Sequence, residues 1–572
     1  MLAQIGLLAL LVVMVALFAS GRVRVEMVAL LGLAAAFLLG LVPEAALFSG
    51  FASPTVITVL EILLIIGVLN RSHVLDAAGR VWPMLDNPRA VLFLLCGLSA
   101  GISVFMNNIG ALALVIPLVL AVGARQAIPA RTLLMPVSFA TLLGGLGSVI
   151  GTPTNLLVAE AIEQVRPASF GFFEIGWVGL PVALVGLAYL AFASPRWIRN
   201  GQADGAGGAQ RQRERAVQRI VPHGSALVGQ DAAMLARNGA RLLDIILAGR
   251  QRPADDTLRP DDLVFLSAPP AILDELDRAG LLAPLPVLGE RVDSVEALVM
   301  PDSIFVGSRI GDLEPLYARD IVVDGLQGGG YPSGGAFAAQ RLRIGDVLLL
   351  RGPPEALAAE LDECGLMALA SPPGGPNTPS SLLPLSLFAG GVALTTLGGL
   401  SPEIAFGLVV IALALTGALS LRRGLETMNW PILIMLGAMI PIGGAVETTG
   451  LARSLVEIVT ALLPAANLPA LLAAMVLLAV VLTPFVNNPS TFLMLAPIAV
   501  ETAHQYGVPP EPLLLAIGVG ASLDFLTPFG HHNNTLVMGL GGYGFGDFLR
   551  LGGPLVLLTA STTVLVLALR FG

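Results

Sequence analysis

The stretch SVFMNNIGALALVIPLVL, residues 103–120, places two adjacent asparagines in an otherwise apolar run. The stretch TPFVNNPSTFLMLAPIAV, residues 483–500, repeats the asparagine pair and the later proline 380 residues further on. In hydrocarbon an unpaired polar group costs several kcal/mol, so such amides need a partner or a water-filled cavity. One pair could join two helices by hydrogen bonds, whereas two pairs in register indicate a duplicated site. The four residues are Asn107, Asn108, Asn487 and Asn488.

The composition excludes a soluble globular protein. Hydrophobic residues make up 55% of the 572 positions and charged residues only 12%, and the mean hydropathy is +0.82. These values are typical of a polytopic α-helical membrane protein, which we expect in the cell (inner) membrane. The net charge of −9 comes mostly from the acids of one central polar segment, so it indicates no nucleic-acid partner.

Apolar runs predict five membrane crossings on each side of that polar segment. A helix rises about 1.5 Å per residue, so about 20 residues cross the bilayer core. Residues 91–122 differ, because their two arms break at the asparagine pair and each is short for a span. They are predicted to form a re-entrant hairpin, as are residues 469–502. The predicted crossings are residues 4–20, 26–43, 54–70, 132–158 and 175–195, and then 383–399, 402–420, 430–446, 511–538 and 553–570.

Arginines predict which helix ends face the cytoplasm, because short loops on that side are enriched in basic residues. If residues 91–122 enter and leave by one face, the arginines of the first half all fall on one side. Five crossings then leave the chain in the cytoplasm near residue 200, and the second half enters the bilayer inverted. The arginines are Arg22, Arg24, Arg71, Arg80, Arg125, Arg131, Arg196 and Arg199, with Arg422 and Arg423 in the second half.

The polar segment divides the chain into four parts. A first membrane repeat occupies residues 1–199 and a second, inverted repeat residues 381–572, with two similar modules at 200–290 and 291–380 between them. Each module combines β-rich stretches with an amphipathic helix such as PEALAAELDECG, which indicates an α/β cytosolic insert. The modules resemble a tandem pair of the C-terminal domains of potassium-uptake regulators (TrkA-C or RCK-C). The resemblance implies binding of a small-molecule regulator or assembly into a homodimer; a solvated structural insert is the alternative.

A second interruption follows each hairpin. The stretches are GGLGSVIGTPTNLLV, residues 144–158, and GASLDFLTPFGHHNNTLV, residues 520–537, which come into register when Asn155 is aligned with Asn534. Glycine and proline in mid-membrane unwind a helix, which frees carbonyls that can bind a hard cation and exposes helix N-termini that favour an anion. Repeats with interrupted helices at corresponding positions are typical of secondary transporters with a site at the midplane.

At these residues the sequence resembles the divalent anion:sodium symporter family, which is SLC13-like and belongs to the ion-transporter superfamily. The resemblance covers the membrane part and implies an anion site flanked by two sodium sites. It implies sodium ligands at Ser103, Asn107, Asn108 and Gly151 for one site, and at Thr483, Asn488 and Gly530 for the other. It implies substrate contacts from Asn107, Asn108, Ile109, Thr152, Pro153, Asn487, Asn488, Pro489, His531 and His532.

Departures from the family pattern affect the expected substrate and coupling. Ile109 and Pro489 stand where the family has threonines that offer hydroxyls to a carboxylate, so sulfate is favoured over a dicarboxylate. His531 and His532 stand where the family has a Thr-Pro pair, and they add titratable groups. Asp524 lies in apolar surroundings and is a candidate for cation or proton coupling; the alternative is an acid paired with a neighbouring amide.

The sequence therefore predicts a secondary transporter, not an enzyme, that couples Na⁺ to symport of a small divalent anion by elevator-like or rocking alternating access. Its expected partners are the anion, sodium and the lipid bilayer, without an organic cofactor. Asp524 and the histidine pair favour one alternative, a cation/proton antiporter of the same superfamily. The insert suggests another, a regulated channel, but a channel would need a continuous polar lining. Glu61, within VITVLEILLIIG, is predicted to form hydrogen bonds inside the helix bundle.

Overall fold

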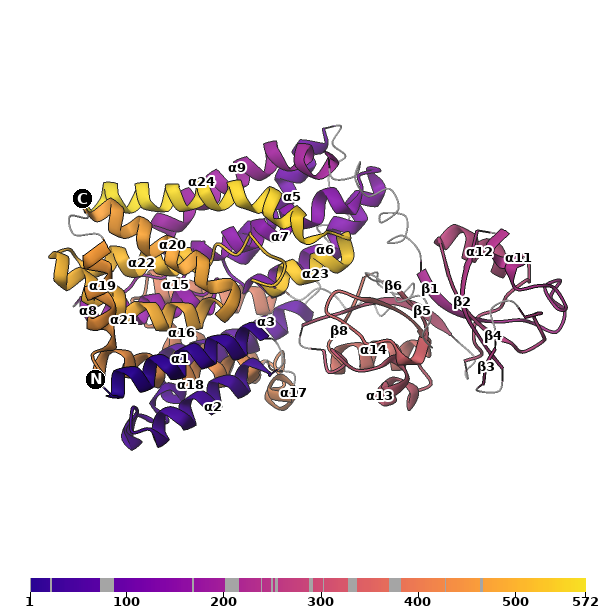
Figure 1. Ribbon diagram of the computed structural model, residues 1–572, viewed down its shortest axis with the longest axis horizontal. Helices are drawn as coiled ribbons and strands as arrows, with labels where there is room; N and C mark the ends of the chain where they lie inside the picture. The colour runs from indigo at the N-terminus through magenta and orange to yellow at the C-terminus, as the bar shows by residue number, and fades with distance from the viewer. Residues whose placement is uncertain are drawn as a thin grey trace. The chain divides into compact units, whose positions relative to one another are not determined.

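The computed structural model divides the chain into two compact units (Figure 1). The helical unit comprises Met1–Trp197, Pro379–Asn534 and Phe545–Gly572, and the second unit comprises Ile198–Thr378 and Thr535–Gly544. Of the arginines used above to predict topology, Arg22 and Arg80 lie outside the described residues. The structure describes residues 2–20, 23–71, 87–166, 169–200, 215–237, 239–247, 250–252, 256–287, 292–301, 303–327, 337–369, 382–426, 428, 430–462 and 467–572.

Two sets of helices in the same order follow one another along the chain, and they lie in the helical unit except for residues 198–200 and 535–541, which belong to the second unit. The first set is α1 (Leu2–Ser20), α2 (Val25–Leu38), α3 (Pro54–Arg71), α5 (Pro88–Ser103), α6 (Asn108–Arg125), α7 (Ala130–Gly144), α8 (Pro153–Val165) and α9 (Gly176–Asn200). The second set is α15 (Leu383–Thr396), α16 (Pro402–Leu415), α18 (Trp430–Thr448), α20 (Leu468–Val486), α21 (Asn488–Tyr506), α22 (Pro510–Gly520), α23 (His532–Gly541) and α24 (Phe545–Phe571). Two further helices, α17 (Leu421–Glu426) and α19 (Leu451–Leu462), have no counterpart among the described residues of the first set.

The two sets pack in reciprocal ways. The helix α2 packs on α18, and α16, its counterpart in order, packs on α3. Likewise α5 packs on α7, and α20 packs on α22. In Figure 1, α1, α2 and α18 lie together along one edge of the helical unit. The exchange between the pairs α2–α18 and α16–α3 is expected when two repeats are related by an approximate two-fold axis.

Each asparagine pair lies at the junction of two helices. The first junction joins α5 to α6 and the second joins α20 to α21. Residues 101–109 show the same succession of exposed, half-buried and buried positions as residues 481–489. Because burial depends on the surroundings of every side chain, this agreement over nine positions shows that the duplication extends from sequence to packing.

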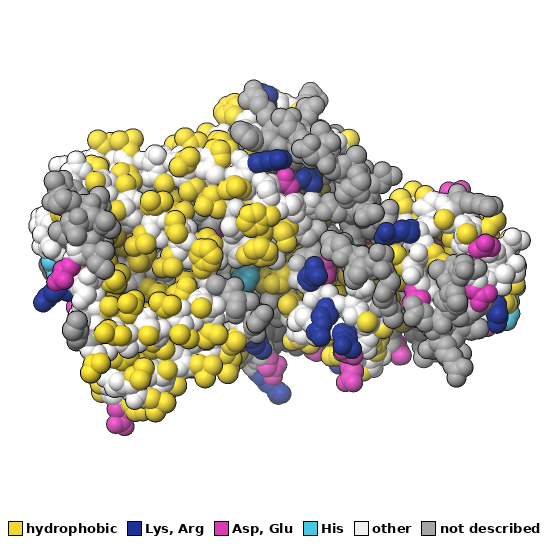
Figure 2. All heavy atoms as spheres, in the orientation of Figure 1, with side chains coloured by type: hydrophobic (Ala, Val, Ile, Leu, Met, Phe, Trp, Pro, Cys, Tyr) yellow, Lys and Arg dark blue, Asp and Glu magenta, His cyan; other side chains and the backbone are white. Residues whose placement is uncertain are grey.

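The surface of the helical unit is suited to lipid. Among the described residues, 7 helical spans are long and apolar enough to cross a membrane, and shorter apolar helices such as α2, α5 and α22 accompany them. Figure 2 shows hydrophobic side chains over most of its visible face and few charged ones. Exposed leucines, valines and phenylalanines at this density are costly in water and favourable in a bilayer.

Two ion-pair groups join the helix sets. Arg131 on α7 lies with its Nη2 2.8 Å from Asp547 Oδ2 on α24. Arg166, at the end of α8, lies 2.8 Å from Glu174 Oε1 and 3.1 Å from Glu511 Oε1 on α22. Although burial raises the pKa of Glu174, hydrogen bonds from Arg166 and from the Gly171 N–H outweigh it and lower that pKa below its usual value. The two groups therefore hold α7 to α24 and the end of α8 to α22.

The second unit is built on one antiparallel eight-stranded sheet, in the order β3-β2-β4-β1-β6-β7-β5-β8. Four strands come from each predicted module, and the halves join where Ala216 and Val217 of β1 pair with Leu326 and Gly325 of β6. The bounds are β1 (Arg215–Ile220), β2 (Arg241–Leu247), β3 (Arg250–Arg252), β4 (Leu263–Ala268), β5 (Asp293–Val299), β6 (Val322–Gln327), β7 (Val347–Gly352) and β8 (Leu366–Ala368), with helices α11 (Ala233–Arg237), α12 (Pro270–Arg278), α13 (Glu314–Tyr317) and α14 (Pro354–Glu363).

The two halves of this sheet repeat the same local structure. Ser225 Oγ donates to Leu281 O at 2.6 Å, and Ser303 Oγ donates to Cys364 O at 2.7 Å. Each half also has its own core, which includes leucines of α12 in the first and of α14 in the second. The polar segment thus folds as two related α/β modules that share one sheet.

Candidate functional site

Four helices of the helical unit begin at the predicted site residues. The first residues of α6 and α21 are Asn108 and Asn488, while α8 begins at Pro153 and α23 at His532. A helix N-terminus carries a partial positive charge and free N–H groups, so it attracts anions. The predicted substrate residues therefore lie just before these four helices or in their first turns.

A side chain caps each of these four N-termini. Asn107 Oδ1 accepts from the Gly110 N–H at 2.7 Å, and Asn487 Oδ1 accepts from the Ser490 N–H at 3.0 Å. Thr152 Oγ1 accepts from the Thr154 N–H at 3.0 Å, and His531 Nδ1 accepts from the Asn533 N–H at 3.1 Å. Because the side-chain oxygens of Asn107 and Asn487 cap the helices that follow, these residues fix the direction in which those helices begin.

The two hairpin tips differ in backbone strain. Asn487 has a φ of 101°, whereas Asn107 has a φ of −63°. A positive φ is unfavourable for a residue with a side chain, and asparagine tolerates it better than most. Asn487 Nδ2 also lies 3.3 Å from Met435 Sδ on α18. The second tip is thus held in an uncommon conformation, which is a frequent feature of binding sites.

Two asparagines organise the unwound segments in the same way. Asn155 Nδ2 donates to Gly145 O at 2.8 Å and to Ser148 O at 2.7 Å. Asn534 Nδ2 donates to Asp524 O at 2.6 Å and to Thr527 O at 3.0 Å. The acceptors lie 10 and 7 residues before the donor in both cases. The alignment of Asn155 with Asn534 is therefore also structural, and Asp524 takes the place of Gly145.

The first cluster consists of Ser103, Asn108, Gly145, Gly151 and Thr152. Ser103 Oγ donates to Asn108 Oδ1 at 2.9 Å. A Cβ on Gly145 would lie 2.4 Å from that oxygen and 3.3 Å from Thr152 Cγ2, and a Cβ on Gly151 would lie 2.3 Å from Gly145 O. The glycines thus let the hairpin tip and the unwound segment touch, and all oxygens in the cluster are neutral.

The second cluster consists of Thr483, Asn488, Asp524, Thr527 and Gly530. The side chain of Asn488 lies beside the carboxylate of Asp524. Gly530 N donates to Thr527 Oγ1 at 3.0 Å, and a Cβ on Gly530 would lie 3.2 Å from Asp524 Oδ1. Thr483 Oγ1 donates to Ala479 O of its own helix at 2.8 Å. Of the residues that the resemblance assigned to the second sodium site, Gly530 thus lies beside Asp524, a carboxylate that the assignment did not include, whereas Thr483 bonds within its own helix.

Hydrogen bonds link the clusters across the two helix sets. Asn533 Nδ2 donates to Asn108 O at 3.0 Å and to Thr141 Oγ1 at 2.8 Å. Ser138 Oγ donates to Asn534 Oδ1 at 3.1 Å. Asn533, Ser138 and Thr141 are not among the site residues predicted from the sequence. The signal for one of them was a third Asn-Asn pair, 533–534, within HHNNTLV.

Several buried oxygens near the helix starts have no hydrogen-bond partner in the described part of the chain. They are Asn155 Oδ1, Thr154 Oγ1, Ser490 Oγ, Thr491 Oγ1, Asp524 Oδ2 and Asn533 Oδ1. A buried polar atom without a partner costs about 1–3 kcal/mol. Their chemical class, neutral oxygens and one carboxylate, is what Na⁺ or another hard cation binds. The residues present therefore fit a cation-binding role.

The remaining predicted residues occupy different surroundings. Ile109, Pro489 and His531 are half-buried, and His532 is exposed. The imidazole of His532 can thus be reached from outside the packed core. Glu61 on α3 is half-buried, with its Oε1 2.9 Å from where a Cβ on Gly407 of α16 would be. Its Oε2 has no hydrogen-bond partner among the described residues, so the predicted hydrogen bonding inside the bundle is not found at that oxygen.

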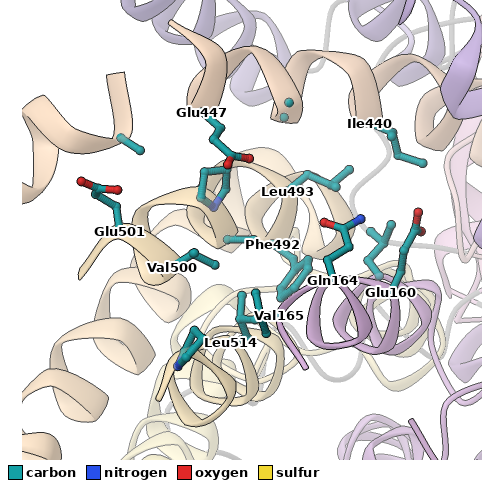
Figure 3. Close-up of a pocket in the computed structure, with 18 of the residues that line it drawn as sticks. Glu160, Gln164, Val165, Ile440, Glu447, Phe492, Leu493, Val500, Glu501 and Leu514 are labelled. Carbon is teal, nitrogen blue, oxygen red and sulfur yellow. The ribbon is translucent and has the colours of Figure 1, made fainter. Parts of the chain in front are cut away.

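A cavity of about 840 Å³ adjoins two of the helix starts (Figure 3). It lies between α18 and α19 on one side and α8, α21 and α22 on the other. Its lining includes Leu157 and Phe492, one turn into α8 and α21, but none of the predicted site residues. In Figure 3, Glu447 points into the cavity from α18 and Gln164 from α8. The cavity therefore ends next to the clusters instead of enclosing them.

Five of the side chains that line this cavity are acidic or basic. They are Glu160, Glu447, Arg453, Glu501 and His504. Arg453 Nε lies 3.0 Å from Glu501 Oε1, and Thr55 Oγ1 donates to Glu160 Oε2 at 2.5 Å. Three carboxylates against one arginine give the lining a net negative charge whenever His504 is neutral, so cations are favoured there.

Comparisons with known proteins identify a family and several relatives of this chain. The family model described as "CitMHS: Citrate transporter" matches residues 15–520 and, again, 458–572. The uncharacterized transporter YfbS of Escherichia coli strain K12 is 27% identical over 99% of this chain and 99% of its own length. The uncharacterized transporter sll0640 of Synechocystis is 27% identical over 98% of this chain and 96% of its own length. The probable sodium/sulfate cotransporter 3 of Chlamydomonas reinhardtii is 26% identical over 47% of this chain and 29% of its own length.

Among solved structures, the crystal structure of the Alcanivorax borkumensis YdaH transporter aligns with a TM-score of 0.46 at 13% identity, over 91% of this chain and 86% of that one. The family match spans most of the chain, and the helices described above are those of a multi-pass membrane protein. The predicted membership of the ion-transporter superfamily and the predicted membrane location are thereby confirmed. The chain belongs to the citrate transporter family, CitMHS, and is a membrane transporter.

Proposed function

We propose that the protein is a Na⁺-coupled symporter of a small divalent anion. The observation that carries this proposal is the meeting of helix starts: Asn533, in the first turn of α23, donates to Asn108 O at the start of α6, and Asn108 lies against Gly145 before α8. Helix N-termini that meet in a buried region supply positive potential without a basic side chain. An anion held there needs no arginine, and it can be released to either side.

Sulfate is the proposed substrate in preference to a dicarboxylate. Ile109 and Pro489 offer no hydroxyl at the two tips, and a tetrahedral dianion can instead be held by the N–H groups of the helix starts. Two matched relatives in Chlamydomonas reinhardtii carry names that refer to sulfur, the probable sodium/sulfate cotransporter 3 and a putative sulfur deprivation response regulator. The second is 27% identical over 93% of this chain.

Sodium is the proposed coupling ion, with one ion in each cluster. Ser103, Asn108 and Gly151 would supply neutral oxygens in the first cluster, and Thr483, Asn488 and Gly530 in the second. The way in which Asn155 and Asn534 gather backbone carbonyls of the unwound segments supports this role. So does Asp524 Oδ2 in the second cluster, which has no hydrogen-bond partner among the described residues. Sodium close to the helix starts would also help to neutralise a dianion.

The test is uptake of radiolabelled sulfate by the purified protein in proteoliposomes. We expect uptake when an inward gradient of sodium chloride is applied, and none when choline chloride replaces it. Excess unlabelled sulfate should compete, whereas citrate and succinate should compete weakly. Sulfate uptake that is the same in both salts would contradict sodium coupling.

A cation/proton antiporter is the second candidate, because Asp524 and the acidic cavity lining favour cations over anions. It is distinguished in the same proteoliposomes without sulfate. An antiporter would move protons out of the vesicles when sodium is added, and a pH-sensitive dye inside them would report the change. The proposed symporter leaves the internal pH unchanged.

We further propose that the two helix sets are inverted repeats and that transport proceeds by alternating access. The identical order of helices and their reciprocal packing support the repeat. Five crossings per repeat, an odd number, would invert the second copy. The arginine pattern then favours a cytoplasmic position for residues 200–380. The cavity between α18–α19 and α8–α21–α22 would then be an outer vestibule, bridged by the Arg453–Glu501 ion pair.

The insert, residues 200–380, is proposed to be a regulatory pair of TrkA-C-like domains. Its two related modules with separate cores support this reading. All residues of both clusters belong to the helical unit. Replacing residues 205–375 by a Gly/Ser linker should therefore preserve sodium-coupled uptake but change its rate or apparent affinity, because a regulator acts through different affinities for two states.

That deletion is measured against the full-length protein at equal reconstituted amounts. Size-exclusion chromatography in detergent first establishes that the shortened protein is folded and monodisperse. A well-folded shortened protein without transport under any condition would show that the insert is part of the transport machinery.

A further inference from the structure

The two clusters have equivalent hairpin tips and unwound segments, but only the second contains a carboxylate. The asparagine pattern makes Asp524 the counterpart of Gly145, because Asn534 and Asn155 bind the carbonyls of these residues at the same spacing. The first cluster thus has no carboxylate. Its space at Gly145 is filled by Asn108 Oδ1, which a Cβ on that glycine would approach to 2.4 Å.

The carboxylate of Asp524 is buried without a cationic partner. Its exposed fraction is 3%, and no ion pair involving Asp524 is found among the described residues. Asp524 Oδ2 has no hydrogen-bond partner in the same set of residues, and the amide side chain of Asn488 lies beside the carboxylate. A buried charge with only an amide beside it is costly unless a cation accompanies it.

The neighbours of Asp524 offer further oxygens to such a cation. Asp524 Oδ1 faces Gly530, whose missing Cβ would lie 3.2 Å away. Thr483 Oγ1 donates to its own helix, unlike Ser103 Oγ in the first cluster, so it does not engage Asn488 and keeps its acceptor lone pair. Threonine, amide and carboxylate oxygens are thereby placed in one cluster, which is a set of ligands typical of a hard cation.

We infer that Asp524 is a direct Na⁺ ligand and that the second cluster is a charged sodium site, whereas the first is neutral. This inference rests on the proposed sodium coupling and adds an asymmetry to it. A formal negative charge in the site attracts Na⁺ without help from the transported anion. The second cluster therefore fills with Na⁺ before the anion is present, and the first fills with weaker affinity.

The test measures thermal unfolding of the purified full-length protein in detergent, without sulfate, as sodium chloride replaces choline chloride at constant ionic strength. Wild type should be stabilised by Na⁺ in a saturable way. Asp524→Asn should weaken the apparent Na⁺ affinity by at least about tenfold, because an amide oxygen replaces a charged one. Without Na⁺ the variant should unfold at a temperature equal to or above that of wild type, since no unpaired charge is buried.

Glu403→Gln is the matched control, because it neutralises a half-buried carboxylate outside both clusters. This carboxylate accepts a hydrogen bond from Ser401 Oγ at 2.6 Å. Its Na⁺ response should equal that of wild type. Gly530→Ala supplies a second test should Asp524→Asn fail to fold. It keeps the charge but sets a methyl group 3.2 Å from Asp524 Oδ1, and it should also weaken Na⁺ binding.

An Asp524→Asn protein that binds Na⁺ like wild type, or a wild-type protein that Na⁺ does not stabilise, would overturn the inference. Sulfate uptake distinguishes this failure from failure of the proposed function. If uptake by wild type depends on sodium but the variant keeps its Na⁺ affinity, only the role of Asp524 is wrong. If Asp524→Asn loses Na⁺ binding but wild type moves no sulfate, the site stands and the substrate is wrong.

Discussion

Asn108→Ala and Asn488→Ala are each expected to lower sodium-dependent sulfate uptake by about 100-fold or more, which corresponds to about 2.7 kcal/mol. Asn108 accepts a hydrogen bond from Ser103 and lies against Gly145, and the side chain of Asn488 lies beside that of Asp524. Each amide thus belongs to a proposed sodium cluster and also begins a helix whose N-terminus is proposed to face the anion. Its loss removes a ligand and leaves a second buried polar group unpaired.

The measurement is initial uptake in proteoliposomes, corrected for the amount of reconstituted protein. Asn467→Ala is the matched control, because Asn467 caps α20 by accepting from the Ala470 N–H at 3.1 Å, at the other end of that helix from the tip. It should change uptake less than about twofold while costing about 1 kcal/mol of stability. Near-normal uptake by either tip variant would contradict the site assignment.

Features that repeat along the chain could be predicted from the sequence. The asparagine pairs with their apolar flanks indicated two hairpins, and glycine and proline located the unwound segments. The structure ends α5 and starts α6 at the first pair, and it leaves residues 521–531 between α22 and α23 outside helices. These features depend on local chemistry, so the pattern of residues carries them.

Contacts between the repeats could not be predicted in the same way. The bonds from Asn533 to Asn108 O and from Ser138 to Asn534 join residues almost 400 positions apart, and each depends on how the helix sets pack. The capping role of Asn107 was also missed, because an asparagine before a helix serves equally well as cap or as ligand. For the insert, each module was visible in the sequence, but the β1–β6 pairing that merges them was not.

Asn155→Ala and Asn534→Ala are expected to destabilise the protein and to abolish its stabilisation by Na⁺. Each variant loses two hydrogen bonds that hold backbone carbonyls of an unwound segment, at about 1 kcal/mol per bond. The cost of Asn155→Ala should thus be about 2 kcal/mol. Asn534 also accepts from Ser138 of the other repeat, whereas Asn155 Oδ1 has no partner among the described residues. Asn534→Ala should therefore cost about 1 kcal/mol more.

The isosteric variant Asn534→Asp separates the two roles of this amide. Its carboxylate can still accept from Ser138 Oγ, but when ionised it has no N–H to donate to Asp524 O or Thr527 O. Thermal unfolding with and without sodium chloride should show no rescue of Na⁺ stabilisation, because the carbonyls of the unwound segment are no longer held. Recovery of wild-type Na⁺ stabilisation by Asn534→Asp would mean that the bond between the repeats, and not the gathering of carbonyls, makes this residue necessary.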